Sequence, residues 1–195
     1  MCTLLPNSEM SDPEYIKRHG IKTVEMRAML THGTPNPDTP DEKQWTVIET
    51  ATMPHDDWKK CYMMAWIVQV LHCFGLTRWW AECMAGLHLE DYANFYEWLE
   101  KFAEQNPGTI LGSMWKRTLN LLESALQGGS WNNIIPKFGD ISWPPDEGGF
   151  LHIIEERERF YDELELLGMP KEQREYGPPS PPKGRELEYA KQVWY

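Results

Sequence analysis

The sequence lacks every stretch that would take a chain into a membrane or onto a nucleic acid. A bilayer span needs about 20 apolar residues, and the longest apolar run is shorter because charged residues at 56–60 precede it and Arg78 follows it. The 19 Lys and Arg residues form no basic stripe, and the formal net charge is −11. We therefore expect no membrane span and no nucleic-acid partner. Because no apolar segment follows a positively charged start, we expect a cytoplasmic protein.

Cysteine is scarce, with four residues in 195. Cys61, Cys73 and Cys83 lie in apolar sequence, where a cysteine usually behaves as a small reduced hydrophobic residue. The sequence has no C-x-x-C pair, and adjacent His72 and Cys73 would point about 100° apart on a helix. We therefore expect no metal site, and we interpret His72 as a buried imidazole that is hydrogen-bonded to a neighbour.

No catalytic motif is recognisable either. The glycine pairs at 128–129 and 148–149 match no phosphate-binding loop, and we interpret them as turns. The carboxylate pairs at 56–57, 90–91 and 146–147 each stand near an expected helix start, where the helix dipole favours negative charge without any acid–base role. A thiol nucleophile would need a histidine brought near it by the fold. We predict no catalytic residue, and a stand-alone metal or thiol enzyme is the least favoured function.

What the sequence does contain is a long apolar segment, and it predicts the helix around which the rest of the chain folds. Between residues 61 and 71 the only clearly polar side chain is Gln69. A helix that is apolar all round leaves no face for water and belongs in an interior. Thr52 and Pro54 suit its start, and Gly75 ends it. We expect a mainly α, compact multi-helix domain around this buried central helix.

Helical periodicity continues on the C-terminal side of the central segment. Residues 76–88 are helical in composition, and 90–104 show the clearest amphipathic pattern, with Phe95 and Leu99 on the inner face. Thr109 is placed to cap a further helix that ends near Gly128. A last helix is expected over 150–167, and the aperiodic stretch 128–149 before it reads as a long loop that is either functional or packed over a core.

The two ends of the chain differ from this helical part. Residues 21–30 and 45–51 have the alternation and β-branched content of strands, which predicts a small N-terminal β hairpin or edge strands. Four prolines between 178 and 182 predict an extended C-terminal tail. The expected domains are therefore a lead-in with two short strands, a helical domain, and a Pro-rich linker with a short terminal helix, over 1–52, 53–168 and 169–195.

Four pieces of the sequence, taken in order, carry a family resemblance. They are residues 10–24 (MSDPEYIKRHGIKTV), 50–73 (TATMPHDDWKKCYMMAWIVQVLHC), 74–78 (FGLTR) and 128–150 (GGSWNNIIPKFGDISWPPDEGGF). As a set they resemble the C-terminal region of radical SAM enzymes that also carry an N-terminal cobalamin-binding domain. The resemblance extends over about residues 1–167 and does not include the tail.

The resemblance implies that the parts of such an enzyme are carried by two separate chains. The full-length enzymes use SAM, an iron–sulfur cluster held by a C-x-x-x-C-x-x-C motif on a barrel domain, and cobalamin in a separate α/β domain. The present sequence has no such motif and no barrel-length series of strands and helices. We therefore expect that no cofactor is bound by this chain, and that its partner is a separate radical SAM catalytic chain.

Such an accessory part would act as a lid on the barrel or as part of the substrate pocket, since radical chemistry requires the exclusion of water. The residues expected to face the substrate or partner are polar positions in and after the central helix and members of the 131–143 loop, namely Gln69, His72, Arg78, Trp131, Asn132, Asn133, Asp140 and Trp143. For the first three, an internal hydrogen-bonding cluster is the alternative. The alternative function is an independent helical protein-binding or scaffold module.

Overall fold

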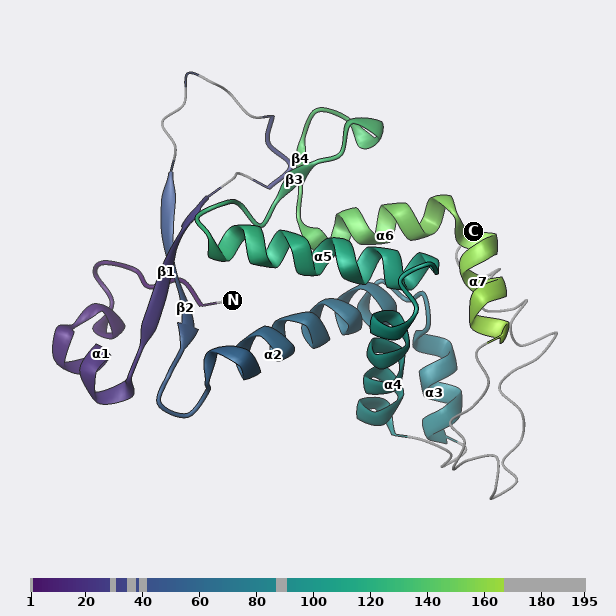
Figure 1. Cartoon of the computed structure of the whole chain (residues 1–195), viewed down its shortest axis with the longest axis horizontal. Helices are drawn as coiled ribbons and strands as arrows, with labels where there is room; N and C mark the ends of the chain where they lie inside the picture. Colours follow the sequence, from purple (N-terminus) through teal and green to yellow (C-terminus); the bar gives the residue numbers. More distant parts are fainter. Residues whose placement is uncertain (1, 29–30, 35–37, 39–41, 87–90, 167–195) are drawn as a thin grey trace. The chain divides into compact units, whose positions relative to one another are not determined.

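The computed structural model describes residues 2–28, 31–34, 38, 42–86 and 91–166. Within these residues the chain forms seven α-helices and two pairs of short antiparallel strands (Figure 1). The mainly α fold predicted from the sequence is therefore confirmed. No helix in the described part of the chain is long and apolar enough to cross a bilayer.

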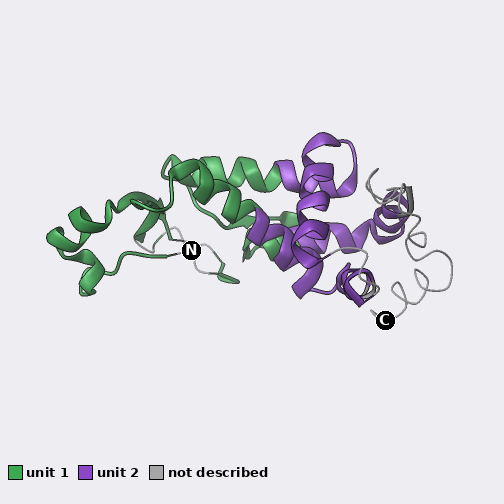
Figure 2. Cartoon of the chain, turned by 90° about the horizontal axis from the view of Figure 1, so that it is seen from below, with its two compact units in different colours: residues 1–63, 117–148 green, residues 64–116, 149–195 purple. Residues whose placement is uncertain are grey.

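The chain divides into two compact units, which are coloured separately in Figure 2. Unit 1 consists of residues 1–63 and 117–148, and unit 2 consists of residues 64–116 and 149–195. The three boundaries at 63/64, 116/117 and 148/149 fall inside helices α2 (His55–Val68), α5 (Ile110–Leu126) and α6 (Pro145–Glu155).

Unit 1 begins with a short helix and a β hairpin. Helix α1 (Pro13–His19) starts at Asp12, whose carboxylate accepts hydrogen bonds from the two backbone N–H groups of Glu14 and Tyr15, and it ends at left-handed Gly20. Strand β1 (Lys22–Arg27) then pairs antiparallel with strand β2 (Lys43–Glu49). The predicted N-terminal hairpin is thereby confirmed.

The stretch that follows α5 carries more structure than the loop expected there. Strand β3 (Asn133–Ile134) pairs antiparallel with β4 (Ser142–Trp143), and the short 3-10 helix η3 (Pro136–Phe138) lies between them. Backbone hydrogen bonds join this stretch to the N-terminal part of unit 1: Arg27 N donates to Gly129 O over 3.0 Å, and His32 N donates to Ser142 O over 2.8 Å. Backbone hydrogen bonds to the N-terminal part of unit 1 therefore hold this stretch in place, although its sequence has no helical periodicity.

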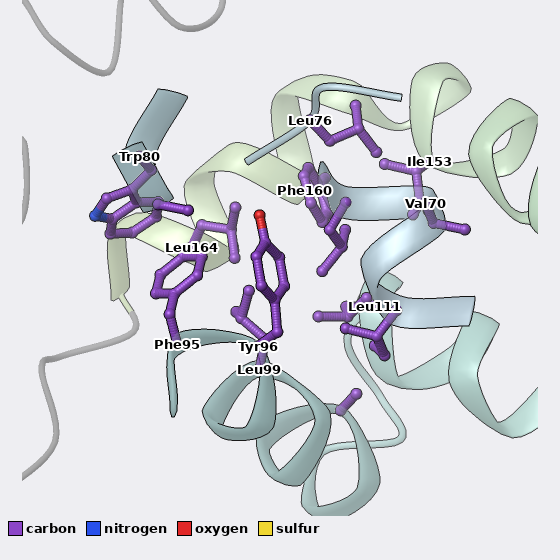
Figure 3. Packing of buried hydrophobic residues seen from close by; sticks show 14 of the residues in the cluster. Val70, Leu76, Trp80, Phe95, Tyr96, Leu99, Leu111, Ile153, Phe160 and Leu164 are labelled. Carbon is purple, nitrogen blue, oxygen red and sulfur yellow. The ribbon is translucent and has the colours of Figure 1, made fainter. Parts of the chain in front are cut away.

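Unit 2 is a helical core. It contains the end of α2, the π-helical turn η2 (Gln69–Cys73), α3 (Arg78–Gly86), α4 (Tyr92–Gln105), the start of α5, most of α6 (Pro145–Glu155) and α7 (Arg157–Leu166). Figure 3 shows the side chains that fill it, among them Phe95 and Leu99 from the predicted inner face of α4. The packing of apolar helix faces against neighbouring helices, rather than intrinsic helix propensity, accounts for most of the stability of such a unit.

The central helix is present but is not buried on every side. Trp66, Ile67 and Val70 are buried as predicted, whereas Cys61 and Ala65 are exposed. The expectation that no face is left for water is therefore wrong. The physical reason for the exposed face is that small residues such as Ala and Cys count as apolar in composition but cost little free energy when they face solvent.

The last predicted helix is two helices, and its start lies earlier. Helix α6 begins at Pro145, a residue well suited to a first helical position, and it gives way to α7 at Glu156. Gly148 and Gly149 are therefore helical, and the interpretation of this pair as a turn is wrong. A Cβ on Gly148 would lie 2.8 Å from Ile135 Cδ1, so glycine here serves a close approach. Gly128, with a φ of 92°, does form a turn as predicted.

Candidate functional site

The central helix of the sequence analysis ends in an irregular turn that shapes unit 2. After Val68 the backbone widens into the π-helical turn η2, in which Phe74 N donates to Gln69 O over 3.1 Å. Gly75 follows with a φ of 88° and reverses the chain. A π turn inserts one extra residue into a helix and occurs frequently at functional sites. In this protein it leaves Val70 and Leu71 in the core and His72 only partly buried.

His72 lines an open groove of about 600 Å³ in unit 2, which we call the His72 groove. Its lining comes from α2, η2, α3 and α4, and consists of Met64, Val68, His72, Glu82, Tyr92, Ala93, Tyr96 and Glu97. The lining is mostly apolar, with a few polar groups at defined positions. Its volume falls within the range of about 300–1,000 Å³ that is typical of small-molecule sites.

A chain of hydrogen bonds leads from the His72 groove into the core. His72 Nδ1 lies 3.0 Å from the Tyr96 hydroxyl, which lies 3.2 Å from Thr77 Oγ1. Thr77 Oγ1 in turn donates to the backbone carbonyl of Leu71 over 3.3 Å. A carbonyl can only accept, so the Thr77 hydroxyl proton is committed to Leu71 and its oxygen accepts from Tyr96. Tyr96 then accepts from His72, which places the proton of a neutral His72 on Nδ1.

Tyr96 is fixed in its protonated form by its surroundings. Burial raises the pKa of its hydroxyl to about 12. Its ring lies among the core side chains drawn in Figure 3 and meets the imidazole of His72 edge-on, with ring centroids 5.6 Å apart. A second edge-on contact joins His72 to Tyr92 at 5.8 Å. The imidazole is therefore oriented by two tyrosines of α4.

Two carboxylates give the His72 groove its charge. Glu82 Oε1 lies 3.9 Å from Arg78 Nε, and Glu97 Oε2 lies 3.8 Å from Lys101 Nζ, all on half-exposed or exposed side chains. Exposed pairs at such distances contribute little free energy, typically below about 1 kcal/mol. Both carboxylates therefore remain available to a cation in the groove.

Of the three sequence-predicted residues in this region, the structure places one in the groove. His72 lines it, whereas Arg78 is exposed at the start of α3 and Gln69 is half-buried at the start of η2. Sequence reasoning missed Tyr96 and the two glutamates. The signal that was available is the spacing of Tyr92 and Tyr96, four residues apart on one helix face.

The five predicted loop residues all lie in unit 1. Trp131 is buried, with its ring centroid 4.7 Å from that of Tyr62 and 6.2 Å from that of Trp58. Burial, followed by the nearby negative charge of Asp146, raises the pKa of Tyr62. Burial also raises the pKa of Asp146 itself. We call Trp58, Tyr62, Trp131 and Asp146 the Trp131 cluster, in which Trp131 is buried and the other three residues are partly buried.

The other loop residues lie around the short strands that follow. Asn132 Nδ2 donates to Thr31 Oγ1 over 3.1 Å, and Asn133 pairs with Trp143 across β3 and β4. Asp140 is exposed. The ring of Trp143 meets that of His32 edge-on at 5.4 Å, and His32 also pairs with Glu147. Sequence reasoning missed this last pair, because no local pattern joins residues 115 positions apart.

The described residues do not fit a metal ion or an iron–sulfur cluster. Among them no group of three or more His, Cys, Asp or Glu side chains comes together to hold a metal. An iron–sulfur cluster is held mainly by cysteine thiolates, and of the cysteines whose positions are described, Cys2 and Cys61 belong to unit 1 and Cys73 to unit 2. We therefore derive no chemical step through such a group on this chain.

Comparison with known proteins gives a family context for these features. No family model matches the sequence. In an alignment of 177 positions that covers 83% of this chain, the chain is 29% identical to the cobalamin-dependent radical SAM methyltransferase TokK of Streptomyces tokunonensis. It resembles part of a cobalamin-dependent radical SAM methyltransferase. Over 177 residues it is also 30% identical to the 2-(S-pantetheinyl)-carbapenam-3-carboxylate methyltransferase of Streptantibioticus cattleyicolor. In both comparisons the chain spans only 25% of the length of the relative.

Proposed function

We propose that this chain is a non-catalytic C-terminal module of a cobalamin-dependent radical SAM enzyme, and that it works with a separate catalytic chain as a lid or as part of the substrate pocket. The observation that carries this proposal is the similarity of 83% of the chain to a stretch that makes up 25% of two cobalamin-dependent or methyl-transferring relatives. The rest of such an enzyme, including its cofactors, would then belong to the partner.

The build of unit 1 supports the lid role. A lid must present a preformed surface that keeps water and stray hydrogen donors away from a radical. The stretch 128–144 has that character, because the Trp131 cluster supports it from within and backbone hydrogen bonds tie it to residues 27 and 32. Trp131 acts by holding the stretch in place, whereas Asp140 and Ile134 are exposed on it and are available to a partner.

The proposal is tested by association with a catalytic chain. A relative from which the matched quarter has been deleted is co-expressed with this chain, and the two are purified through a tag on one of them. We expect a stable complex with one copy of each chain. Failure of the two to associate, with both chains folded, contradicts the proposal.

A pair of matched substitutions tests which surface makes the contact. Ile134 and Met53 are both exposed apolar residues of unit 1, with 40% and 39% of their surface accessible. Ile134→Glu places a charge on the 128–144 stretch and is expected to weaken the complex at least tenfold, whereas Met53→Glu is the control and is expected to leave it unchanged. Equal effects of the two substitutions contradict the assignment of the contact to this stretch.

One observation favours an independent protein-binding module as the second candidate. Leu5 and Trp45 are 61% and 47% exposed, and the backbone of Leu4 donates to Trp45 O over 2.7 Å, so the two apolar side chains belong to neighbouring segments. Exposed apolar groups that lie together mark interaction surfaces. If this candidate holds, Trp45→Ala abolishes partner binding and Ile134→Glu does not.

A further inference from the structure

We propose that the His72 groove of unit 2 is a binding site for a small molecule that carries a protonated alkylamine. The inference does not rest on the proposed accessory function, because the whole lining belongs to unit 2 of this chain. Three properties of the groove select this chemistry. They are a free hydrogen-bond acceptor, two carboxylates and an apolar wall.

The acceptor is Nε2 of His72. The hydrogen-bond chain through Tyr96 and Thr77 ends on a backbone carbonyl, and it therefore places the imidazole proton on Nδ1. Nε2 then carries a lone pair, and it has no hydrogen-bond partner among the described residues. A ligand that satisfies it must be a donor. Because Nε2 is an acceptor, a ligand that offers only acceptors at this position cannot form a hydrogen bond with it.

The carboxylates of Glu82 and Glu97 decide the charge of that donor. They line the groove, and no Lys or Arg side chain is part of its lining. The cations nearest to them, Arg78 and Lys101, approach at 3.9 Å and 3.8 Å on exposed side chains. These pairs are weak enough to coexist with a bound cation or to be displaced by it. An ammonium group meets both requirements, since it is a cation that has only donors.

The remaining lining fixes the rest of the ligand. Met64, Val68 and Ala93 form an apolar wall suited to an alkyl chain. Tyr92 and Tyr96 add aromatic rings, to which a cation is attracted electrostatically. The site therefore favours an ammonium group on an aliphatic chain, whereas a carboxylate-bearing ligand would be repelled by both glutamates.

The proposal is tested with three probes that share a six-carbon chain, namely hexylammonium, hexanol and hexanoate, added to the full chain at neutral pH and low salt. Binding is followed through the methyl resonance of Met64 in methionine-labelled protein, assigned with Met64→Leu. Hexylammonium is expected to bind about tenfold more tightly than hexanol, as befits one charge-assisted hydrogen bond, and hexanoate is expected not to bind. Equal affinities for the three probes, or no saturable shift with hexylammonium, overturn the proposal.

Substitutions then separate charge from hydrogen bonding. Glu97→Gln, and more strongly Glu82→Gln with Glu97→Gln, is expected to reduce the preference for hexylammonium over hexanol. Glu104→Gln, an exposed position on the same helix as Glu97 but outside the lining, is the charge-matched control for Glu97→Gln. His72→Phe is expected to reduce hexylammonium binding, because it removes the acceptor Nε2. If Glu104→Gln has the same effect as Glu97→Gln, only general acidity attracts the probe and the site is refuted.

Discussion

The contact between the end of α4 and the start of α5 makes a sharp prediction for Gly112→Ala. Gly112 is buried in the first turn of α5, and a Cβ built on it would lie 2.0 Å from the backbone oxygen of Asn106 and 2.8 Å from that of Ala103. Real Cβ contacts essentially never fall below 3.0 Å, so the two helices would have to separate by about 1 Å. Because the atoms that clash are backbone atoms, no side-chain rotation can relieve the overlap.

The magnitude follows from three contributions. Alanine is favoured over glycine in a helix by at most about 1 kcal/mol. Overpacking costs about 1–3 kcal/mol. Moving Asn106 also disturbs its carbonyl, which accepts from Thr109 N over 3.0 Å and from Thr109 Oγ1 over 2.8 Å, and each such bond contributes about 1 kcal/mol. The substitution is therefore expected to lower the free energy of unfolding by about 3 kcal/mol.

Urea unfolding of the full chain at 25 °C, followed by far-ultraviolet circular dichroism, measures this change. Gly86→Ala is the control, because Gly86 is also helical but a Cβ on it meets no atom within 4 Å. The control is expected to be as stable as the unaltered chain or slightly more stable. If Gly112→Ala is equally stable, the predicted close contact between α4 and α5 does not exist and the packing described for unit 2 is wrong.

Three other predictions test burial and ionisation. Gly149→Ala places a Cβ 2.9 Å from the ring of buried Trp66 and should destabilise the chain by about 1–2 kcal/mol; a gain in urea resistance contradicts this. Burial, and then nearby carboxylates, raise the pKa of Glu100, so its charged form is disfavoured in the folded chain. Glu100→Gln should therefore raise the free energy of unfolding at pH 7 by about 0.5 kcal/mol or less, and the gain should vanish as pH falls below the ordinary range of a glutamate; a gain independent of pH refutes the ionisation argument. Cys61 and Cys73 are free and exposed, so both should react with a thiol reagent in the folded chain, and labelling only after denaturation contradicts their placement.

The elements that sequence alone predicted are those whose signals are local. The inner face of α4 was readable because Phe95 and Leu99 repeat at helical spacing, and both are buried. Thr109 was readable as a helix cap, and its hydroxyl accepts from Gly112 N over 3.0 Å. Two of the acidic pairs are confirmed as helix-start residues, since Asp56 and Asp57 stand in the first turn of α2 and Asp146 and Glu147 in the first turn of α6.

The features that escaped prediction depend on contacts between distant parts of the chain. The His72 groove requires Tyr96, 24 residues away, and a π turn that has no composition of its own. In the sequence the two glycines inside α6 resemble a turn. The structure shows instead that Ile135 and Trp66 lie too close to them for a larger side chain. His72 and Trp131 stand out in the sequence because each is an unusual side chain in its local surroundings, whereas Glu82 resembles any surface acid, and the role of all three in a site stays a prediction.

We propose that this chain serves a catalytic partner that holds the cofactors. The most direct measurement is the amount of SAM consumed per methylated product formed by the catalytic chain, with and without this chain. A lid that excludes water from the radical is expected to lower that ratio severalfold and to consume no SAM when assayed alone. An unchanged ratio, or SAM consumption by this chain in the absence of a partner, contradicts the account.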